Sequence, residues 1–115
     1  MLRGEIRLVN LDPVRRDEAS KTRPAVIVSN DALNATSMSR ERGIVTVVPI
    51  TSNVAMVYPF QVKLTRKQSG LRVDSKAQAE QIRSVSVSRI GARVGRLNAD
   101  LQEQLDIALR LHLGL

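Results

Sequence analysis

Two runs of apolar residues constrain the fold of this chain more than any other feature. Ala25-Val26-Ile27-Val28 is apolar at every position, which predicts a strand buried on both faces. Residues 44–50 (IVTVVPI) give the strongest β signal of the sequence, because β-branched side chains pack well on a pleated surface. Pro49 has no backbone N–H, so we expect that end of the strand to lie at a sheet edge or a bulge. The fold must therefore be built around a buried β-sheet.

Shorter segments with strand-like alternation lie on both sides of these runs. They are residues 5–11, 60–64, 77–82 and 90–94. The assignment of 77–82 is ambiguous, because the apolar residues from 75 to 87 fit a helical period as well. Asn30 and Asp31 are suited to cap a short helical turn over residues 32–38, and Ser69-Gly70 predicts a turn.

The end of the chain has helical periodicity. Asn98 is a candidate N-cap, and the apolar positions behind it recur at helical spacing; they are Leu101, Leu105, Ala108, Leu109 and, at the far end, His112. Many short strands followed by one terminal helix predict a mainly β fold with helices (α+β). We expect a small, strongly bent sheet or barrel with the helix packed on it, forming one domain over residues 1–115.

The terminal helix carries more apolar residues than one buried face requires. Ile107, Leu111 and Leu113 lie beyond the face that Leu101 and Leu105 define. A second copy of the chain would bury this surplus, so we expect a homodimer.

The charge of the chain suits a polyanionic partner. Eighteen Lys and Arg against eleven Asp and Glu give a net charge of +7, and neutralised phosphates release condensed counterions on binding. Such a charge is also compatible with solubility alone. Tyr58 and Phe60 are the only aromatic residues, which disfavours a surface that binds bases mainly by stacking.

Composition also excludes several kinds of site. The chain has no cysteine, and His112 is its only histidine. A disulfide framework, a thiolate metal site and a two-histidine acid/base pair are therefore impossible, and we expect no metal and no cofactor. No apolar stretch approaches the ~20 residues of a membrane span, and the N-terminus has no signal-peptide pattern. We expect a cytoplasmic protein without a membrane contact.

Three segments bring reactive side chains to the ends of predicted strands. The first is a charged, loop-like stretch, residues 14–22, which leads into Arg23. The alternative to a functional role for Arg23 is a structural salt bridge to Asp12, Glu5 or Glu18. The second is Thr51-Ser52-Asn53, which is also typical of a turn that satisfies its own backbone.

The third segment is Lys76-Ala77-Gln78-Ala79-Glu80. In a strand, Lys76, Gln78 and Glu80 share one face, because side chains alternate with period two. A polar face beside small alanines leaves room for a ligand, and a solvated outer face explains the pattern equally well.

The order of these motifs resembles one family. The matching strings are Arg3-Gly4-Glu5-Ile6, Leu11-Asp12-Pro13, Glu18, Arg23-Pro24-Ala25-Val26-Ile27-Val28-Ser29-Asn30, Val48-Pro49-Ile50-Thr51-Ser52, Tyr58-Pro59-Phe60-Gln61-Val62 and Glu80-Gln81-Ile82-Arg83-Ser84. Together they resemble the MazF/PemK/Kid toxins of type II toxin–antitoxin systems. The resemblance implies a PemK-like, SH3-like small β-barrel that forms a homodimer. It also implies an endoribonuclease that cleaves single-stranded RNA at short motifs and slows growth.

The same resemblance implies partners and site residues. The partners are an acidic MazE-like antitoxin and, only through the toxin–antitoxin complex, operator DNA. Arg23 and Thr51 match the family's catalytic pair, and Glu18 matches an acidic loop position. A guanidinium is a fork of charged donors and a poor proton acceptor, so we assign Arg23 to the scissile phosphate, Thr51 to a non-bridging oxygen and Glu18 to the base or to orienting Arg23. The expected RNA-binding residues are Asp17, Lys21, Ser52, Lys76, Gln78 and Glu80.

The sequence departs from the family at several of these positions. In the Kid branch, a histidine precedes the matching glutamate, and an arginine and an aspartate on a later strand serve the chemistry. Here those positions hold Asp17, Gln78 and Glu80, and the loop glycine common in the family is Arg16. The Kid-type acid/base scheme is therefore in doubt, although Glu80 could still act as a base.

Three alternatives to a ribonuclease stay open. One is a nucleic-acid-binding module without catalysis, which shares the charge and the fold but gives no reason for Glu18, Arg23 and Thr51 to occur together. Another is a gyrase-poisoning toxin of the related CcdB type. The third is a plain structural protein.

Overall fold

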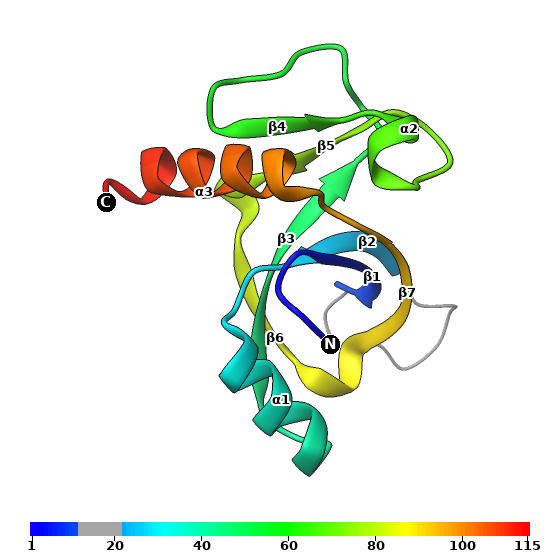
Figure 1. Cartoon of the computed structure of the whole chain (residues 1–115), viewed down its shortest axis with the longest axis vertical. Helices are drawn as coiled ribbons and strands as arrows, with labels where there is room; N and C mark the ends of the chain where they lie inside the picture. The colour runs from blue at the N-terminus through cyan, green and yellow to red at the C-terminus, as the bar shows by residue number, and fades with distance from the viewer. Residues whose placement is uncertain (12–21) are drawn as a thin grey trace.

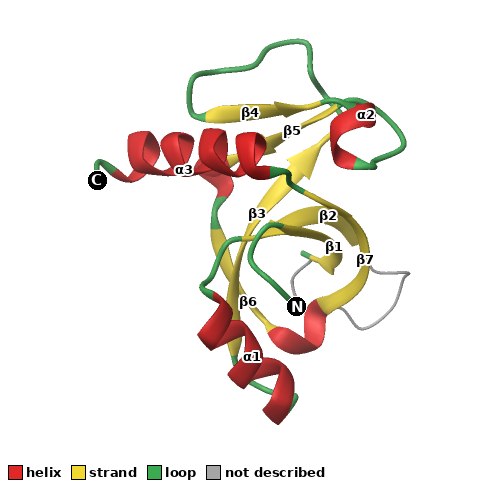
Figure 2. Ribbon diagram, viewed as in Figure 1, coloured by secondary structure: helices red, strands yellow, loops and turns green. Residues whose placement is uncertain are grey.

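Seven antiparallel strands form one curved sheet in the computed structural model, which describes residues 1–11 and 22–115 (Figures 1 and 2). The strands are β1 (Glu5–Asn10), β2 (Thr22–Ile27), β3 (Ile44–Thr51), β4 (Gln61–Leu64), β5 (Ser75–Gln78), β6 (Arg83–Ser86) and β7 (Ile90–Arg96). Their order is β4-β5-β3-β2-β1-β7, and β6 pairs with β3. The predicted α+β class with a strongly bent sheet is thus confirmed.

β3 is the centre of this sheet. β2 pairs with one side of it, while β6 and β5 divide the other side, β6 along residues 44–47 and β5 at residues 50–51. The register shifts by three residues between the pairs Ile50–Ala77 and Val47–Arg83, and the three residues of η1 (Ala79–Gln81) take up the difference. Pro49 lies opposite this interruption. No hydrogen bond between strands is needed there, so the missing N–H of proline costs nothing.

The predicted strand over residues 77–82 is therefore wrong in its extent. β5 begins at Ser75 and ends at Gln78, and a single 3-10 turn separates it from β6. The physical reason is the change of register beside Pro49, which the local pattern of apolar residues does not encode. Glu80 consequently lies in the turn and does not continue the strand face of Lys76 and Gln78.

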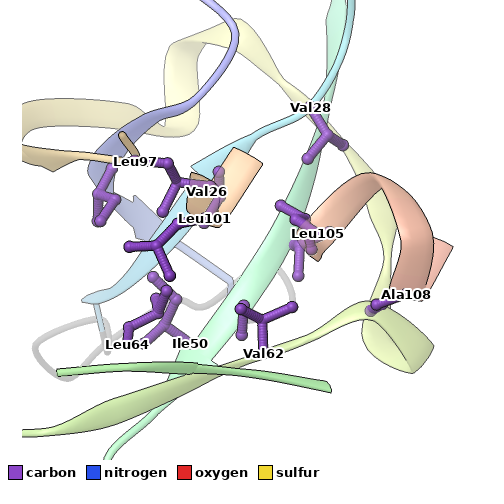
Figure 3. Close-up of a cluster of buried hydrophobic side chains, with 13 residues drawn as sticks. Val26, Val28, Ile50, Val62, Leu64, Leu97, Leu101, Leu105 and Ala108 are labelled. Atoms are coloured by element: carbon purple, nitrogen blue, oxygen red, sulfur yellow. The ribbon is translucent and has the colours of Figure 1, made fainter. Parts of the chain in front are cut away.

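β2 and β3 separate two hydrophobic cores, which confirms the predicted burial of residues 25–27 on both faces of the sheet. Val26 and Val48 point into a larger core, whereas Ile27 and Val47 point into a smaller one on the opposite face. All four side chains are fully buried. Figure 3 shows the larger core, in which side chains of the sheet meet those of the C-terminal helix.

The C-terminal helix α3 (Ala99–Leu113) begins as predicted at Asn98, whose side chain accepts a hydrogen bond from the Leu101 N–H at 2.8 Å. Leu101, Leu105 and Ala108 are buried on its inner face, and the helix packs across β4 and η1 (Figure 1). Helical spacing thus identified three of the five positions as buried, and a fourth, Leu109, is half-buried against the same core. His112, at the far end, is exposed.

Arg3 connects α3 to the residue that follows β2. Its Nη2 donates to Asp106 Oδ1 at 2.7 Å, and its Nε donates to the Val28 carbonyl at 3.0 Å. Partial burial by itself raises the pKa of the Asp106 carboxyl, but hydrogen bonds from Arg3 and Gln102 and the charge of Arg3 outweigh it, so the net pKa is lowered. The ion pair therefore favours the packed position of the helix at neutral pH.

Two shorter helices complete the described part of the chain. α1 (Asp31–Arg40) is capped by Asn30, which confirms that predicted cap, and is longer than the turn expected over residues 32–38. α2 (Arg66–Ser69) was not predicted; it ends at Gly70, whose φ of 81° is the left-handed conformation that glycine favours. A further 3-10 turn, η2 (Val87–Arg89), links β6 to β7. None of the described helices is long and apolar enough to cross a membrane.

Candidate active site

A groove of about 640 Å³ opens where β2 begins and β3 ends. Its lining comes from four strands near the groove (β1, β2, β3 and β7), from the start of β5, and from the loops that follow β3 and α2. The lining residues are Leu8, Arg23, Pro24, Ile50, Thr51, Ser52, Gly70, Leu71, Arg72, Val73, Ser75 and Val94. Its volume is in the range of ligand sites in proteins, about 300–1,000 Å³. Three of the residues singled out from sequence, Arg23, Thr51 and Ser52, therefore belong to one groove.

Antiparallel pairing brings Arg23 and Thr51 together. β2 and β3 pair at Ala25 and Pro49, and continuing that register by two residues places Arg23 opposite Thr51. A strand that starts with a functional residue and an antiparallel neighbour that ends with one expose both side chains at the same edge. The two motifs, far apart in sequence, converge for this reason.

Arg23 has no ion-pair partner among residues 1–11 and 22–115, and its side chain is exposed. The proposed partner Glu5 is occupied, because its Oε1 accepts a hydrogen bond from Arg7 Nη2 at 2.9 Å. Burial raises the pKa of Glu5, but the hydrogen bond and the charge of Arg7 outweigh it, and the net pKa is lowered. Asp12 and Glu18, the other two candidate partners, lie outside the described residues.

Thr51 stabilises a turn, and its hydroxyl donates no hydrogen bond to any of the described residues. Its Oγ1 accepts a hydrogen bond from the Asn53 N–H at 3.2 Å, and Asn53 Oδ1 accepts one from the Ala55 N–H at 3.3 Å. The turn interpretation of this segment is thus confirmed. A hydroxyl that accepts one hydrogen bond still has its own hydrogen to donate, so the turn fixes Thr51 Oγ1 and leaves it able to donate into the groove.

The groove is cationic. Two arginines, Arg23 and Arg72, line it, and no aspartate or glutamate of the described residues does. Three hydroxyl side chains accompany them, and the remaining walls are mostly aliphatic. Sequence reasoning missed Arg72, because a single arginine in an exposed loop has no local pattern that sets it apart.

Lys76 has a different environment from the one its pattern suggested. It is only 7% exposed, its ammonium donates to the Met56 carbonyl, and its Nζ lies 5.9 Å from the centre of the Tyr58 ring. Tyr58 in turn stacks on Phe60 with ring centres 5.4 Å apart. Lys76 thus fastens the loop of residues 52–60 onto β5, and it does not line the groove.

Glu80 is connected to the same loop through Gln61. Gln61 Nε2 donates to Glu80 Oε2 at 2.7 Å, while Gln61 Oε1 accepts from the Tyr58 N–H at 3.1 Å. The second carboxylate oxygen, Glu80 Oε1, is buried without a hydrogen-bond partner among the described residues. Gln78 is half-buried, and neither it nor Glu80 lines the groove.

The predicted site residues Asp17, Glu18 and Lys21, and the departure at Arg16, lie outside the described residues. Within the described ranges, no group of three or more histidine, aspartate or glutamate side chains is arranged to hold a metal ion.

The fold of this chain is that of solved MazF toxins. It superimposes with a TM-score of 0.77 on the toxin MazF-mt6 of Mycobacterium tuberculosis, at 22% identity, covering 96% of this chain and 97% of the other. An endoribonuclease from a mycobacterial species, solved in complex with its cognate antitoxin, gives a TM-score of 0.76 at 23% identity, covering 100% and 96%.

Sequence comparison is more specific. The family model of PemK-like, MazF-like toxins of type II toxin–antitoxin systems matches residues 2–113. Endoribonuclease MazF9 of Mycobacterium tuberculosis is 57% identical over 115 residues, which cover 100% of this chain and 98% of that relative. The chain therefore belongs to the PemK-like, MazF-like toxins of type II toxin–antitoxin systems, and its enzyme class is that of the endoribonucleases. The family that the ordered motifs indicated is confirmed.

Proposed function

We propose that this toxin cleaves single-stranded RNA at short sequence motifs without a metal ion, in the cytoplasm, and thereby inhibits translation and growth. One observation carries the proposal: Arg23 and Thr51 line a single groove that contains two arginines and no described carboxylate. Such a lining attracts a phosphodiester, whereas a groove with acidic walls would repel it.

RNA supplies its own nucleophile. The 2′-oxygen attacks phosphorus, the bond from phosphorus to the 5′-oxygen breaks, and the proton released by the 2′-hydroxyl is balanced by one delivered to the 5′-oxygen. The products are a 2′,3′-cyclic phosphate and a 5′-hydroxyl. The protein therefore has to orient the reacting atoms, move a proton and stabilise charge on the phosphoryl oxygens.

Arg23 and Thr51 suit the stabilising part of this task. The Arg23 guanidinium offers forked, charged donors to two phosphate oxygens, and the Thr51 hydroxyl donates to a non-bridging oxygen. Glu18 is our proposed base, or else orients Arg23. Asp17 and Lys21, from the same segment, and Ser52, from the groove wall, are proposed to contact RNA.

The other three predicted RNA contacts enter the proposal in modified form. The ammonium of Lys76 is engaged by Met56, so we assign Lys76 to holding the loop of residues 52–60 in place beside bound RNA. Gln78 and Glu80 are assigned to RNA contacts at the border of that loop, where both residues are half-buried.

We also propose a homodimer and an antitoxin partner. Ile107, Leu111 and Leu113 are 55%, 57% and 49% exposed on α3, and a second copy of the chain would bury them. The partner of this basic chain is proposed to be an acidic MazE-like antitoxin, and operator DNA is bound only by the complex of the two.

The test is incubation of the purified protein with long single-stranded RNA in EDTA, followed by sequencing of new ends that carry a 5′-hydroxyl. We expect discrete cuts that share a short motif, with no cutting of DNA of the same sequence. Cutting that requires added Mg²⁺ would refute the metal-free mechanism. Intact RNA bound by a folded protein would support a non-catalytic module, and inhibition of gyrase instead would support a CcdB-type toxin.

A further inference from the structure

Arg72 is a cation of the groove that neither the sequence motifs nor the proposed chemistry uses. It lies in the loop between α2 and β5, its side chain is exposed, and it lines the groove together with Arg23 and Thr51. Among the residues that the structure describes, it has no ion pair. Its nearest acidic neighbour in sequence, Asp74, forms no ion pair with it in the described part of the chain; Asp74 Oδ1 accepts a hydrogen bond from the Arg66 N–H at 2.7 Å.

The loop that carries Arg72 is held at both ends. Gly70 caps α2, and its N–H donates to the Arg66 carbonyl at 3.1 Å. The Leu71 N–H donates to Ser69 Oγ at 3.1 Å, and on the far side Ser75 Oγ donates to the Val73 carbonyl at 3.0 Å. Binding an anion at Arg72 therefore requires little ordering of the backbone, which favours affinity.

A close backbone contact sets the position of this loop against the sheet. A Cβ at Gly95 would lie 2.2 Å from the Ser69 carbonyl oxygen, so only glycine lets the end of α2 approach β7 this closely. The contact brings Leu71 and Val73 beside Val94 in the groove wall. The guanidinium of Arg72 is thus carried next to an aliphatic surface.

The chemistry of these neighbours matches one nucleotide unit. The aliphatic wall of Leu71, Val73 and Val94 can cover the face of a base, and a cation at its rim can neutralise a phosphate. We propose that Arg72 binds the phosphate adjacent to the scissile one and so fixes the register of the RNA strand in the groove. This inference rests on the proposed function, because it takes Arg23 as the residue that contacts the scissile phosphate.

The experiment compares wild-type protein with Arg72→Ala, Arg72→Lys and Arg66→Ala. Arg66 is exposed on α2 and does not line the groove, so its variant is the control for loss of one positive charge nearby. The probe is a fluorescent RNA oligonucleotide that carries the cut sequence mapped on the wild type, with a 2′-O-methyl group at the cut nucleotide. Kd is measured at several salt concentrations, and single-turnover cleavage is measured on the unmodified RNA.

We expect Arg72→Ala to raise Kd at least fivefold and to lower the slope of log Kd against log salt by about 0.7, the value for one phosphate of single-stranded RNA. Saturating RNA should restore most of the cleavage rate, Arg72→Lys should retain the wild-type salt slope, and Arg66→Ala should leave both slope and Kd close to wild type.

Three results would overturn the inference. They are an unchanged Kd and salt slope in Arg72→Ala, an equal loss in Arg66→Ala, and a cleavage defect in Arg72→Ala that saturating RNA does not relieve. If Arg72→Ala instead weakened only the binding of an acidic antitoxin peptide, the residue would belong to a protein interface. Wild-type protein that does not cut RNA would refute the proposed function and, with it, the role of Arg72. If the wild type cuts RNA and Arg72→Ala has the same Kd and salt slope, only the role of Arg72 is refuted.

Discussion

Arg23 and Thr51 each lie two residues beyond the last pair of β2 and β3, Ala25 with Pro49, and both line the same groove. The site therefore forms where β2 begins and the neighbouring strand β3 ends. A phosphate placed between the two side chains would meet a fixed positive charge on one side and a hydroxyl donor on the other. The predictions below begin with this pair.

Arg23→Ala is expected to lower the cleavage rate about 10²- to 10³-fold, the usual cost of removing one preorganised donor from a developing oxyanion. Arg23→Lys keeps the charge without the fork and should be intermediate. The rate is measured under single-turnover conditions, with circular dichroism as the test of folding. Because Arg23 is exposed and has no ion pair in the described part of the chain, its loss should leave the fold intact. Normal cleavage by Arg23→Ala would remove it from the mechanism.

Thr51→Val keeps the shape of the side chain and removes the hydroxyl. We expect cleavage to slow about 10- to 100-fold, because a hydrogen bond to a charged group is worth about 1.5–3 kcal/mol. Thr51→Ser is the matched control and should retain most of the activity. Equal rates for the valine and serine variants would show that the hydroxyl serves only the turn to Asn53.

Leu111→Glu tests the apolar surface of α3. Leu111 is 57% exposed in the single chain, so a charge there should not unfold it, but it would be buried unpaired in a dimer that uses this face. We expect a shift from dimer to monomer in size-exclusion chromatography with light scattering. Arg96→Ala, which also lowers the net charge by one on exposed β7, should remain dimeric. A dimer unaffected by Leu111→Glu would place the interface elsewhere.

Asp106 should make stability depend on acidic pH. Its pKa is lowered in the folded chain by Arg3, against an unfolded value of about 3.9. Because the carboxyl has a lower pKa in the folded than in the unfolded chain, its ionised form stabilises the fold. This stabilisation is complete at pH values above the unfolded pKa and is lost as the pH falls through the folded pKa. Urea unfolding should therefore show that the difference between wild type and Asp106→Asn, about 1 kcal/mol or less at pH 7, shrinks below about pH 4. A difference that grows on acidification would contradict this assignment.

Gly95→Ala tests the contact between β7 and α2. The added Cβ would meet the Ser69 carbonyl oxygen, which is backbone and cannot rotate away. Overpacking of this kind costs about 1–3 kcal/mol, so we expect a lower urea midpoint together with weaker RNA binding as the Arg72 loop is displaced. Ala92→Ser, on an exposed position of the same strand, is the control. Wild-type stability and binding in Gly95→Ala would mean that the loop moves without cost.

Sequence reasoning succeeded where a pattern is repeated locally. Val26 and Ile27 were correctly placed in a strand with two buried faces, and Asn98 was correctly placed at the start of the terminal helix. It failed at Glu80, because the three-residue change of register opposite Pro49 depends on a strand far away in the chain. Arg72 carried no signal either, since its role comes from the groove that surrounds it.

The sequence by itself determined the class of the fold, its principal strands and terminal helix, and the family to which the chain belongs. These follow from side-chain periodicity and from ordered motifs, which are properties of neighbouring residues. Only the tertiary structure decided that Arg23, Thr51 and Arg72 share one groove and that Lys76 is buried beneath the loop of residues 52–60. The physical reason is that strand register and loop packing arise from contacts between distant segments. One residue of register shift would turn strand residues such as Arg23 and Thr51 to the opposite face of the sheet.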